Sequence, residues 1–233
     1  MTYIICEAGT THYAVLQERR FNQAKLAIID AKRAGADAIK WQMFVPDEPL
    51  FCPMEGDDKR WDRWNNTLLT LEQWKAVKAE CDIHNIDFLA SVFQMQGIEW
   101  LKELEPKYYK VASRAVWNYP YELVSPGPFL ISMGDLEFRK EFGPWPQRGE
   151  GLDCVMKYPA PLNEAMWEGE SAGLSDHSGT VWPGLDAIAR GADFLEVHFC
   201  PDGTNPGNDA PVCLNFNQLK LLCDFNKAEK EMA

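Results

Sequence analysis

The sequence lacks the features that mark several large classes of protein. No run approaches the roughly 18 consecutive apolar residues of a membrane-spanning helix, and the N-terminus has no basic segment of the kind that opens a secretory leader. No Gly-x-Gly-x-x-Gly motif follows the first predicted strand, which argues against a dinucleotide-binding fold. We therefore expect a cytoplasmic protein without a membrane partner.

Positive charge is also in short supply. The chain has 23 Lys and Arg residues against 35 Asp and Glu, for a formal net charge of −12. Because phosphate backbones select basic surfaces, nucleic acid is excluded as a partner. A small anion can still bind, provided that the cations are concentrated at one place.

The cysteines follow no pattern of paired ligands. There are seven, an odd number, and no pair has Cys-x-x-Cys spacing. We predict neither a disulfide framework nor a zinc knuckle, and interpret most of the cysteines as small core residues in a reducing compartment.

Short apolar runs alternate with helical patterns along the chain, which is typical of a parallel sheet covered by helices. The predicted strands are 3–6, 38–43, 87–91, 108–112, 129–132, 152–156, 172–175 and 194–199. Eight such units in 233 residues favour a single α/β domain over residues 1–233, folded as a (β/α)8 TIM barrel.

Helices are predicted at 18–34, 71–84, 97–104, 163–169, 181–189 and 216–230. Thr70 and Gln73 form a capping-box pattern at the start of the second of these helices. The segment between the fifth and sixth strands is too short for a full helix with its loops. The longest connection, 44–69, follows the second strand and could act as a lid on the catalytic face.

Strand alternation predicts two histidines in the barrel interior. On the last strand, Glu196 and His198 share the inward face, and His177 ends the preceding strand, 21 residues earlier. Neighbouring strands would therefore present two imidazoles side by side near their C-terminal ends, where barrel enzymes keep their chemistry. Such a pair suits Mn²⁺, Zn²⁺ or Fe²⁺. Hydrogen-bonded core histidines are the alternative.

The same alternation points Lys40, Gln42 and Lys110 inward. A buried lysine is costly without a partner, so one of them could pair with Glu7 or Glu196. Hydroxyl groups at strand ends offer the other interpretation, a phosphate-binding cradle. These hydroxyls belong to Ser91, Ser113, Ser132 and Ser175.

Three further residues leave two interpretations open. Glu7 could act as an acid or base, or form an ion pair with a barrel lysine. Tyr158 could contact substrate or be a core aromatic residue. Cys200 shares the alternation of His198 and could reach a metal, although a buried thiol is favoured.

Together, the motifs resemble those of the barrel domain of the sialic acid synthase (N-acetylneuraminate synthase) family, over residues 4–215. They are Cys6-Glu7-Ala8-Gly9 followed by His12, the run 34–42, Tyr109-Lys110-Val111-Ala112-Ser113, Gly173-Leu174-Ser175-Asp176-His177, Glu196-Val197-His198-Phe199 and Pro206-Gly207-Asn208-Asp209. No single motif is specific, but their order is.

The resemblance implies that phosphoenolpyruvate condenses with an aldehyde sugar such as N-acetylmannosamine, giving a sialic-acid-type 2-keto acid and phosphate. It implies a divalent metal, most often Mn²⁺, on His177 and His198. Phosphoenolpyruvate would bind Lys40, Ser91, Lys110, Ser113, Ser132 and Ser175. Glu7, Gln42, Tyr158, Glu196 and Asp209 would contact substrate or complete the site, with Glu7, Lys40, Lys110 and Glu196 catalytic.

The chain departs from the family pattern in its sugar half. Ala115 stands where the family has a glutamate that helps to activate water, Met156 replaces an asparagine, and Thr11 another. The usual C-terminal antifreeze-like domain is also missing, so an oligomer is possible but not assured. These departures imply either a different acceptor or a loss of turnover.

Two other functions remain open. A non-catalytic or divergent small-molecule-binding barrel would explain Ala115 and Met156. Metal-assisted hydrolysis of a phosphoester would use the same cations, but no general base stands out for it.

Overall fold

The computed structural model describes residues 1–46, 57–124, 127–142 and 149–232. Its strands close into a parallel barrel in sequence order, with the last strand paired to the first. They are β1 (Tyr3–Gly9), β2 (Ala38–Met43), β3 (Asp87–Val92), β4 (Tyr109–Val111), β5 (Phe129–Ser132), β6 (Gly149–Cys154), β7 (Gly173–Asp176) and β8 (Phe194–His198). The predicted (β/α)8 barrel is therefore confirmed.

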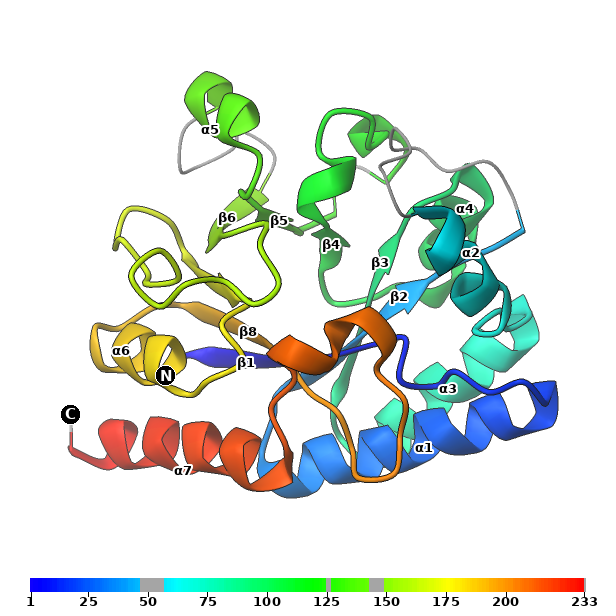
Figure 1. Cartoon of the computed structure of the whole chain (residues 1–233), viewed down its shortest axis with the longest axis horizontal. Helices are drawn as coiled ribbons and strands as arrows, with labels where there is room; N and C mark the ends of the chain where they lie inside the picture. Colours follow the sequence, from blue (N-terminus) through cyan, green and yellow to red (C-terminus); the bar gives the residue numbers. More distant parts are fainter. Residues whose placement is uncertain (47–56, 125–126, 143–148, 233) are drawn as a thin grey trace.

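Helices surround the barrel (Figure 1). They are α1 (Gln17–Ala34), α2 (Asp57–Asn65), α3 (Leu71–Ile83), α4 (Met95–Leu104), α5 (Leu136–Phe142), α6 (Trp182–Ala189) and α7 (Phe216–Met232). Short 3₁₀ turns are η1 (Ser113–Ala115), η2 (Tyr121–Leu123) and η3 (Gly207–Val212). No helix in these described ranges is long and apolar enough to cross a bilayer.

Two predictions about connecting segments were wrong. Residues 163–169 form turns and bends rather than a helix, and Gly169 at the end of this segment adopts a positive φ of 86°. Residues 136–142, between β5 and β6, do form a helix. The lid role expected of the connection after β2 stays a prediction: this connection contains α2, and its residues 47–56 lie outside the described ranges.

The cysteine prediction also needs correction. Cys200 and Cys213 form a disulfide, so Cys200 is neither a buried thiol nor available to a metal. The backbone brings the two residues together, because Leu214 pairs with the end of β8 and Cys200 N–H donates to the Leu214 carbonyl. The other described cysteines are free and buried, as predicted: Cys6, Cys81, Cys154 and Cys223. Cys52 lies outside the described residues.

The barrel interior changes from apolar to polar along the strands. An aromatic layer closes the N-terminal end, where Tyr3, Tyr108 and Phe194 pack edge to face. The next layer is aliphatic and fully buried: Ile5, Ala38, Leu89, Leu130 and Leu152. Above it, the inward positions carry charged and hydroxyl side chains. The sequence thus places its polar interior residues at the C-terminal ends of the strands, where βα loops shape a pocket.

Candidate active site

A pocket opens at the C-terminal end of the barrel, and every predicted site residue lines it. These residues are Glu7, Lys40, Gln42, Ser91, Lys110, Ser113, Ser132, Tyr158, Ser175, His177, Glu196, His198 and Asp209. They come from β1 to β8 and the loops that follow them, so no short stretch of sequence contains the site. Strand alternation accounts for most of this convergence.

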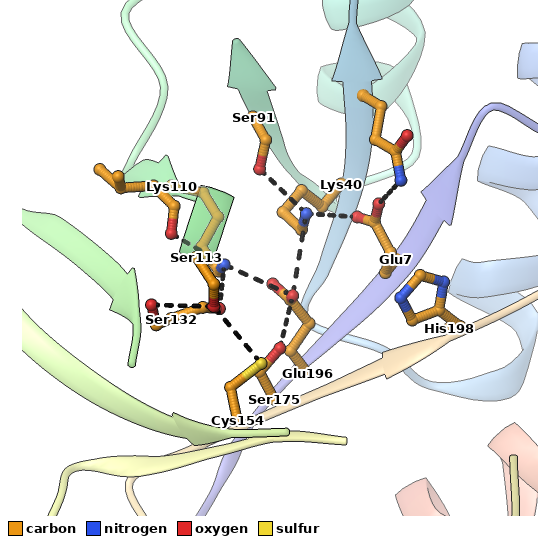
Figure 2. A network of polar contacts seen from close by, with 12 residues as sticks. Glu7, Lys40, Ser91, Lys110, Ser113, Ser132, Cys154, Ser175, Glu196 and His198 are labelled. Atoms are coloured by element: carbon orange, nitrogen blue, oxygen red, sulfur yellow. Dashed lines mark hydrogen bonds and ion pairs between the residues drawn. The ribbon is translucent and has the colours of Figure 1, made fainter. Parts of the chain in front are cut away.

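Two lysines and two glutamates form a charge-balanced network at the pocket floor (Figure 2). Lys40 Nζ lies 2.6 Å from Glu7 Oε2 and 3.8 Å from Glu196 Oε1. Lys110 Nζ lies 3.5 Å from the same Glu196 oxygen. At most 4% of any of these side chains is exposed, so their mutual neutralisation is what allows them to be buried.

Hydroxyl groups extend this network. Lys40 donates to Ser91 Oγ at 3.1 Å, and Lys110 donates to Ser132 Oγ at 2.7 Å. Ser175 donates to Glu196 Oε1 at 3.0 Å. The predicted pairing of the lysines with glutamates is therefore confirmed; the lysines also face the predicted hydroxyls, and phosphate binding by this cradle stays a prediction. This cluster concentrates hydrogen-bond donors at one place in an acidic protein, as binding of a phosphoryl group requires.

The buried charges shift one another's ionisation. Burial raises the pKa of Glu7 to about 7, against the opposing charge of Lys40. Burial acts in the same direction on Glu196, but Lys110 and Lys40 outweigh it and lower the pKa of that carboxyl. Burial lowers the pKa of Lys110. Glu7 is consequently the group of this network that can exchange a proton near neutral pH.

The two imidazoles lie side by side beside the lysine network. The ring centroids of His177 and His198 are 5.2 Å apart. His177 Nδ1 donates to the Val155 carbonyl at 2.7 Å, which leaves Nε2 facing the Tyr158 hydroxyl at 3.0 Å. A backbone carbonyl that orients one ring nitrogen while the other faces a cavity is a common arrangement for a metal-binding histidine.

The surroundings of His198 fit a cation. Its Nδ1 is buried without a hydrogen-bond partner, and Asp209 Oδ2 is 3.8 Å away. Burial, reinforced by the charge of His177, lowers the pKa of His198 well below its usual value, so this ring is neutral as a ligand must be; His177, whose pKa is raised, would have to release its proton when a cation binds. Among the described residues no group of three or more His, Cys, Asp or Glu side chains is arranged so that it could hold a metal ion. Two imidazoles would thus leave positions open for substrate or water.

Cys154 is a pocket residue that strand alternation could have identified. It follows Leu152 on the inward face of β6, and its Sγ lies 3.7 Å from His177 Nδ1. Burial opposes the charged form of both groups, yet their mutual attraction raises the pKa of His177 to about 9 and lowers that of the thiol. The cysteine count alone suggested a core residue and concealed this position.

Other pocket residues come from segments without a strand pattern. Arg60, Arg63 and Trp64 belong to α2, in the long connection after β2, and Arg114 belongs to η1. Trp64 stacks on Phe44 with ring centroids 4.6 Å apart. No periodicity in the sequence relates these residues to the barrel, because their placement depends on how the connection packs across its face.

Two of the three expected departures from the family pattern, Ala115 and Met156, occupy different environments. Ala115 is buried in the core between barrel and helices. Met156 lines the pocket with 40% of its surface exposed. An apolar side chain therefore stands in the pocket at the position where the resemblance leads us to expect an amide.

Fold and site define a class: a (β/α)8 barrel whose C-terminal pocket combines lysines, hydroxyls and two histidines. Comparison with known proteins places the chain within that class. The profile of the NeuB family matches residues 27–134 and 151–233, and the chain belongs to this family.

Several relatives support the assignment. The chain is 29% identical to the N,N'-diacetyllegionaminic acid synthase of Campylobacter jejuni, covering 95% of this chain and 74% of that protein. It is 30% identical to the spore coat polysaccharide biosynthesis protein SpsE of Bacillus subtilis, covering 99% and 68%. The crystal structure of N-acetylneuraminic acid synthetase from Leptospira borgpetersenii shares the fold, with a TM-score of 0.81, 24% identity and coverage of 99% and 84%.

Proposed function

We propose that this chain condenses phosphoenolpyruvate with an aldehyde sugar resembling N-acetylmannosamine, yielding a sialic-acid-type 2-keto acid and inorganic phosphate. The observation that carries this proposal is the position of two buried lysines and their serine partners directly beside two imidazoles. Relatives that are named sialic-, legionaminic- and pseudaminic-type acid synthases support the same class of reaction.

The lysine side of the pocket is suited to phosphoenolpyruvate. Lys40 and Lys110 supply positive charge, and their serine partners can donate to phosphate or carboxylate oxygens once the anion arrives. Ser113 and Ser175 line the same pocket. Binding of the anion to preorganised donors fixes the enol carbon toward the histidines, which replaces a bimolecular encounter by an oriented one.

The histidine side is suited to the aldehyde. His177 and His198 would hold a divalent cation, for which Mn²⁺ is our candidate, and this cation would polarise the aldehyde oxygen. Gln42, Tyr158 and Asp209 surround that position and can orient the sugar hydroxyls. In the balanced reaction, C3 of phosphoenolpyruvate bonds to the aldehyde carbon, water adds to C2, and the bond between C2 and the phosphate oxygen breaks.

Protons must move in this reaction, and Glu7 is placed to exchange them. Its pKa of about 7 allows both charge states near neutrality. Gln42 donates to its Oε1 at 3.3 Å, which connects the carboxyl to the sugar side of the pocket. We therefore assign Glu7 the role of acid or base, and Glu196 that of balancing the charges of the two lysines.

Turnover tests the proposal. Protein, Mn²⁺, phosphoenolpyruvate and a panel of aldoses should release inorganic phosphate only when an aldose is present, and His177→Ala should lose both Mn²⁺ binding and phosphate release. Phosphate release without aldose would indicate phosphoester hydrolysis. Binding of phosphoenolpyruvate with no turnover across a broad panel would instead favour a binding protein, the alternative that Ala115 and Met156 support.

Lys110 provides a test of the anion subsite. Lys110→Met should weaken phosphoenolpyruvate binding at least about tenfold, because a charge-assisted contact is worth roughly 1.5–3 kcal/mol. Isothermal titration calorimetry measures this change. Lys107→Met is the matched control, since Lys107 pairs with Asp87 and packs on Tyr3 at the opposite end of the barrel. Equal affinities in both variants would contradict the assignment.

A further inference from the structure

The connection from β8 to α7 places a carboxylate over the pocket. Asp209, in η3, accepts from Gln42 Nε2 at 3.3 Å and lies 3.8 Å from His198 Nδ1. We call residues 200–213 of this connection the Asp209 loop. The Cys200–Cys213 disulfide closes the loop at its base. The disulfide joins only the two ends of the loop and does not by itself fix the position of the residues between them. Asp209 therefore depends on contacts that the tip makes elsewhere.

Arg63 makes those contacts. From α2 its Nη2 donates to the Asn205 carbonyl and its Nη1 donates to Asn205 Oδ1 at 3.4 Å, both at the tip of the Asp209 loop. The same guanidinium donates through Nε to Thr10 Oγ1 at 2.7 Å and through Nη2 to the Thr10 carbonyl at 2.9 Å. It also lies over the ring of Tyr13, 4.9 Å from the centroid. One side chain thus ties together the loops that follow β1, β2 and β8.

The local backbone leaves room for this guanidinium. Gly207 has a φ of +63°, and a Cβ built there would lie 2.5 Å from Arg63 Nε and 2.6 Å from Cζ. Asn205 Oδ1 also accepts from Gly207 N–H at 3.0 Å, so the amide that meets Arg63 also stabilises the turn before η3. Arg63 and the Asp209 loop fit each other through shape as well as hydrogen bonds.

We propose that Arg63 is a positioning residue that fixes the Asp209 loop over the pocket and thereby holds Asp209 beside Gln42 and His198. This inference rests on the proposed function, because it assigns Asp209 to the aldehyde side of the site. Arg63 acts through the loop, and its contacts are with Thr10, Tyr13 and Asn205 rather than with the lysines. Its removal should consequently affect the aldehyde far more than phosphoenolpyruvate.

Hydrogen–deuterium exchange tests the tether without any substrate. In Arg63→Ala, exchange in a peptide covering residues 203–209 should accelerate about tenfold, as loss of charge-assisted hydrogen bonds predicts, while β-strand peptides keep their protection. Arg190→Ala is the matched control: Arg190 also donates to loop carbonyls, those of Trp167 and Glu168, and also lies over an aromatic ring, away from the pocket. Unchanged exchange at 203–209 in Arg63→Ala would overturn the proposal.

Kinetics tests the consequence for the site. With Mn²⁺ and the aldose that the wild type uses fastest, Arg63→Ala should raise KM for the aldose at least about tenfold and leave KM for phosphoenolpyruvate within about twofold. Arg63→Lys should recover part of the aldose KM, because one ammonium can reach either Thr10 or Asn205. Faster exchange without any change in the aldose KM would also overturn the proposal. If the wild type turns over no aldose, the proposed function fails, while exchange still decides whether Arg63 holds the loop.

Two glycines in the same loop supply an independent comparison. Gly203 and Gly207 both have positive φ values, of +77° and +63°, but a Cβ at Gly203 would meet no atom within 4 Å. Alanine at either position incurs the left-handed strain, and only Gly207→Ala displaces Arg63. Gly207→Ala should therefore reproduce the Arg63→Ala exchange pattern and aldose KM, and Gly203→Ala should not. Identical behaviour of the two variants would count against a specific role for Arg63.

Discussion

At the residue scale, the pocket contains buried charges that are stable only because they compensate one another. Glu7, Lys40, Lys110 and Glu196 are each almost completely buried, and removing one partner would leave another charge uncompensated. With both glutamates ionised, the network is charge-balanced before any anion enters. An incoming phosphate must compete with Glu196 for the lysines. Until then, the ion pairs with Glu196 keep the ammonium groups and the serine hydroxyls oriented toward the cavity.

His12 shows the same cost of buried charge away from the pocket. It is fully buried, its Nε2 contacts the Thr67 carbonyl at 3.0 Å, and its ring packs edge-on against Trp41 and Trp74. Burial lowers its pKa from 6.5 to about 3. Between these values the unfolded chain binds the proton and the folded chain does not, so the free energy of unfolding falls as the pH falls.

We expect His12 to contribute a loss of about 2 kcal/mol in unfolding free energy between pH 7 and pH 5. Urea unfolding of the wild type and of His12→Gln at both pH values measures it. The substituted amide can still donate to the Thr67 carbonyl but has no proton to gain, so the variant should lose less stability than the wild type. An equal loss in both proteins would show that His12 does not remain neutral.

At the element scale, the strands were predictable and the connections were less so. Alternation along β2 and β8 gives the inward positions of Lys40, Gln42, Glu196 and His198 directly. By contrast, α2 and η3 bring Arg63 and Asn205 together over a sequence separation of 142 residues. No local propensity encodes that contact, because each segment only acquires its position by packing on the finished barrel.

The predicted capping box at α3 is confirmed and gives a quantitative test. Gln73 N–H donates to Thr70 Oγ1 at 3.2 Å, and Thr70 N–H donates to Gln73 Oε1 at 2.9 Å. Thr70→Ala should lower the free energy of unfolding by about 1 kcal/mol, as measured by urea denaturation. Thr70→Ser keeps the hydroxyl and should retain most of the stability; a serine variant as unstable as the alanine variant would argue against the cap.

At the scale of the whole molecule, the N-terminal and C-terminal parts of the chain meet and close the barrel. β8 pairs with β1, and α7 lies beside α1 beneath the barrel (Figure 1). Asn226 of α7 accepts from Thr2 N–H at 3.1 Å and donates to the Thr2 carbonyl at 2.7 Å. Both residues are buried, so this amide satisfies backbone groups at the start of the first strand that water cannot reach.

Asn226→Ala should therefore destabilise the molecule by roughly 2–4 kcal/mol, because it leaves two buried backbone groups unpaired. Chemical denaturation would measure the loss. Asn226→Asp retains an acceptor for Thr2 N–H but places a buried carboxylate against the Thr2 carbonyl, so we expect it to be at least as unstable as the alanine variant at neutral pH. A neutral effect of Asn226→Ala would mean that solvent reaches Thr2.

The sequence by itself determined the barrel, the order of its strands and the inward direction of its polar side chains. These properties follow from periodicity, which each strand encodes in a few consecutive residues. Only the tertiary structure decided that the lysines pair with glutamates as well as face serines, that Cys200 joins Cys213, and that Arg63 holds the Asp209 loop. Such contacts join residues from distant segments, and their distances are fixed only when the closed barrel brings the ends of its strands to one face.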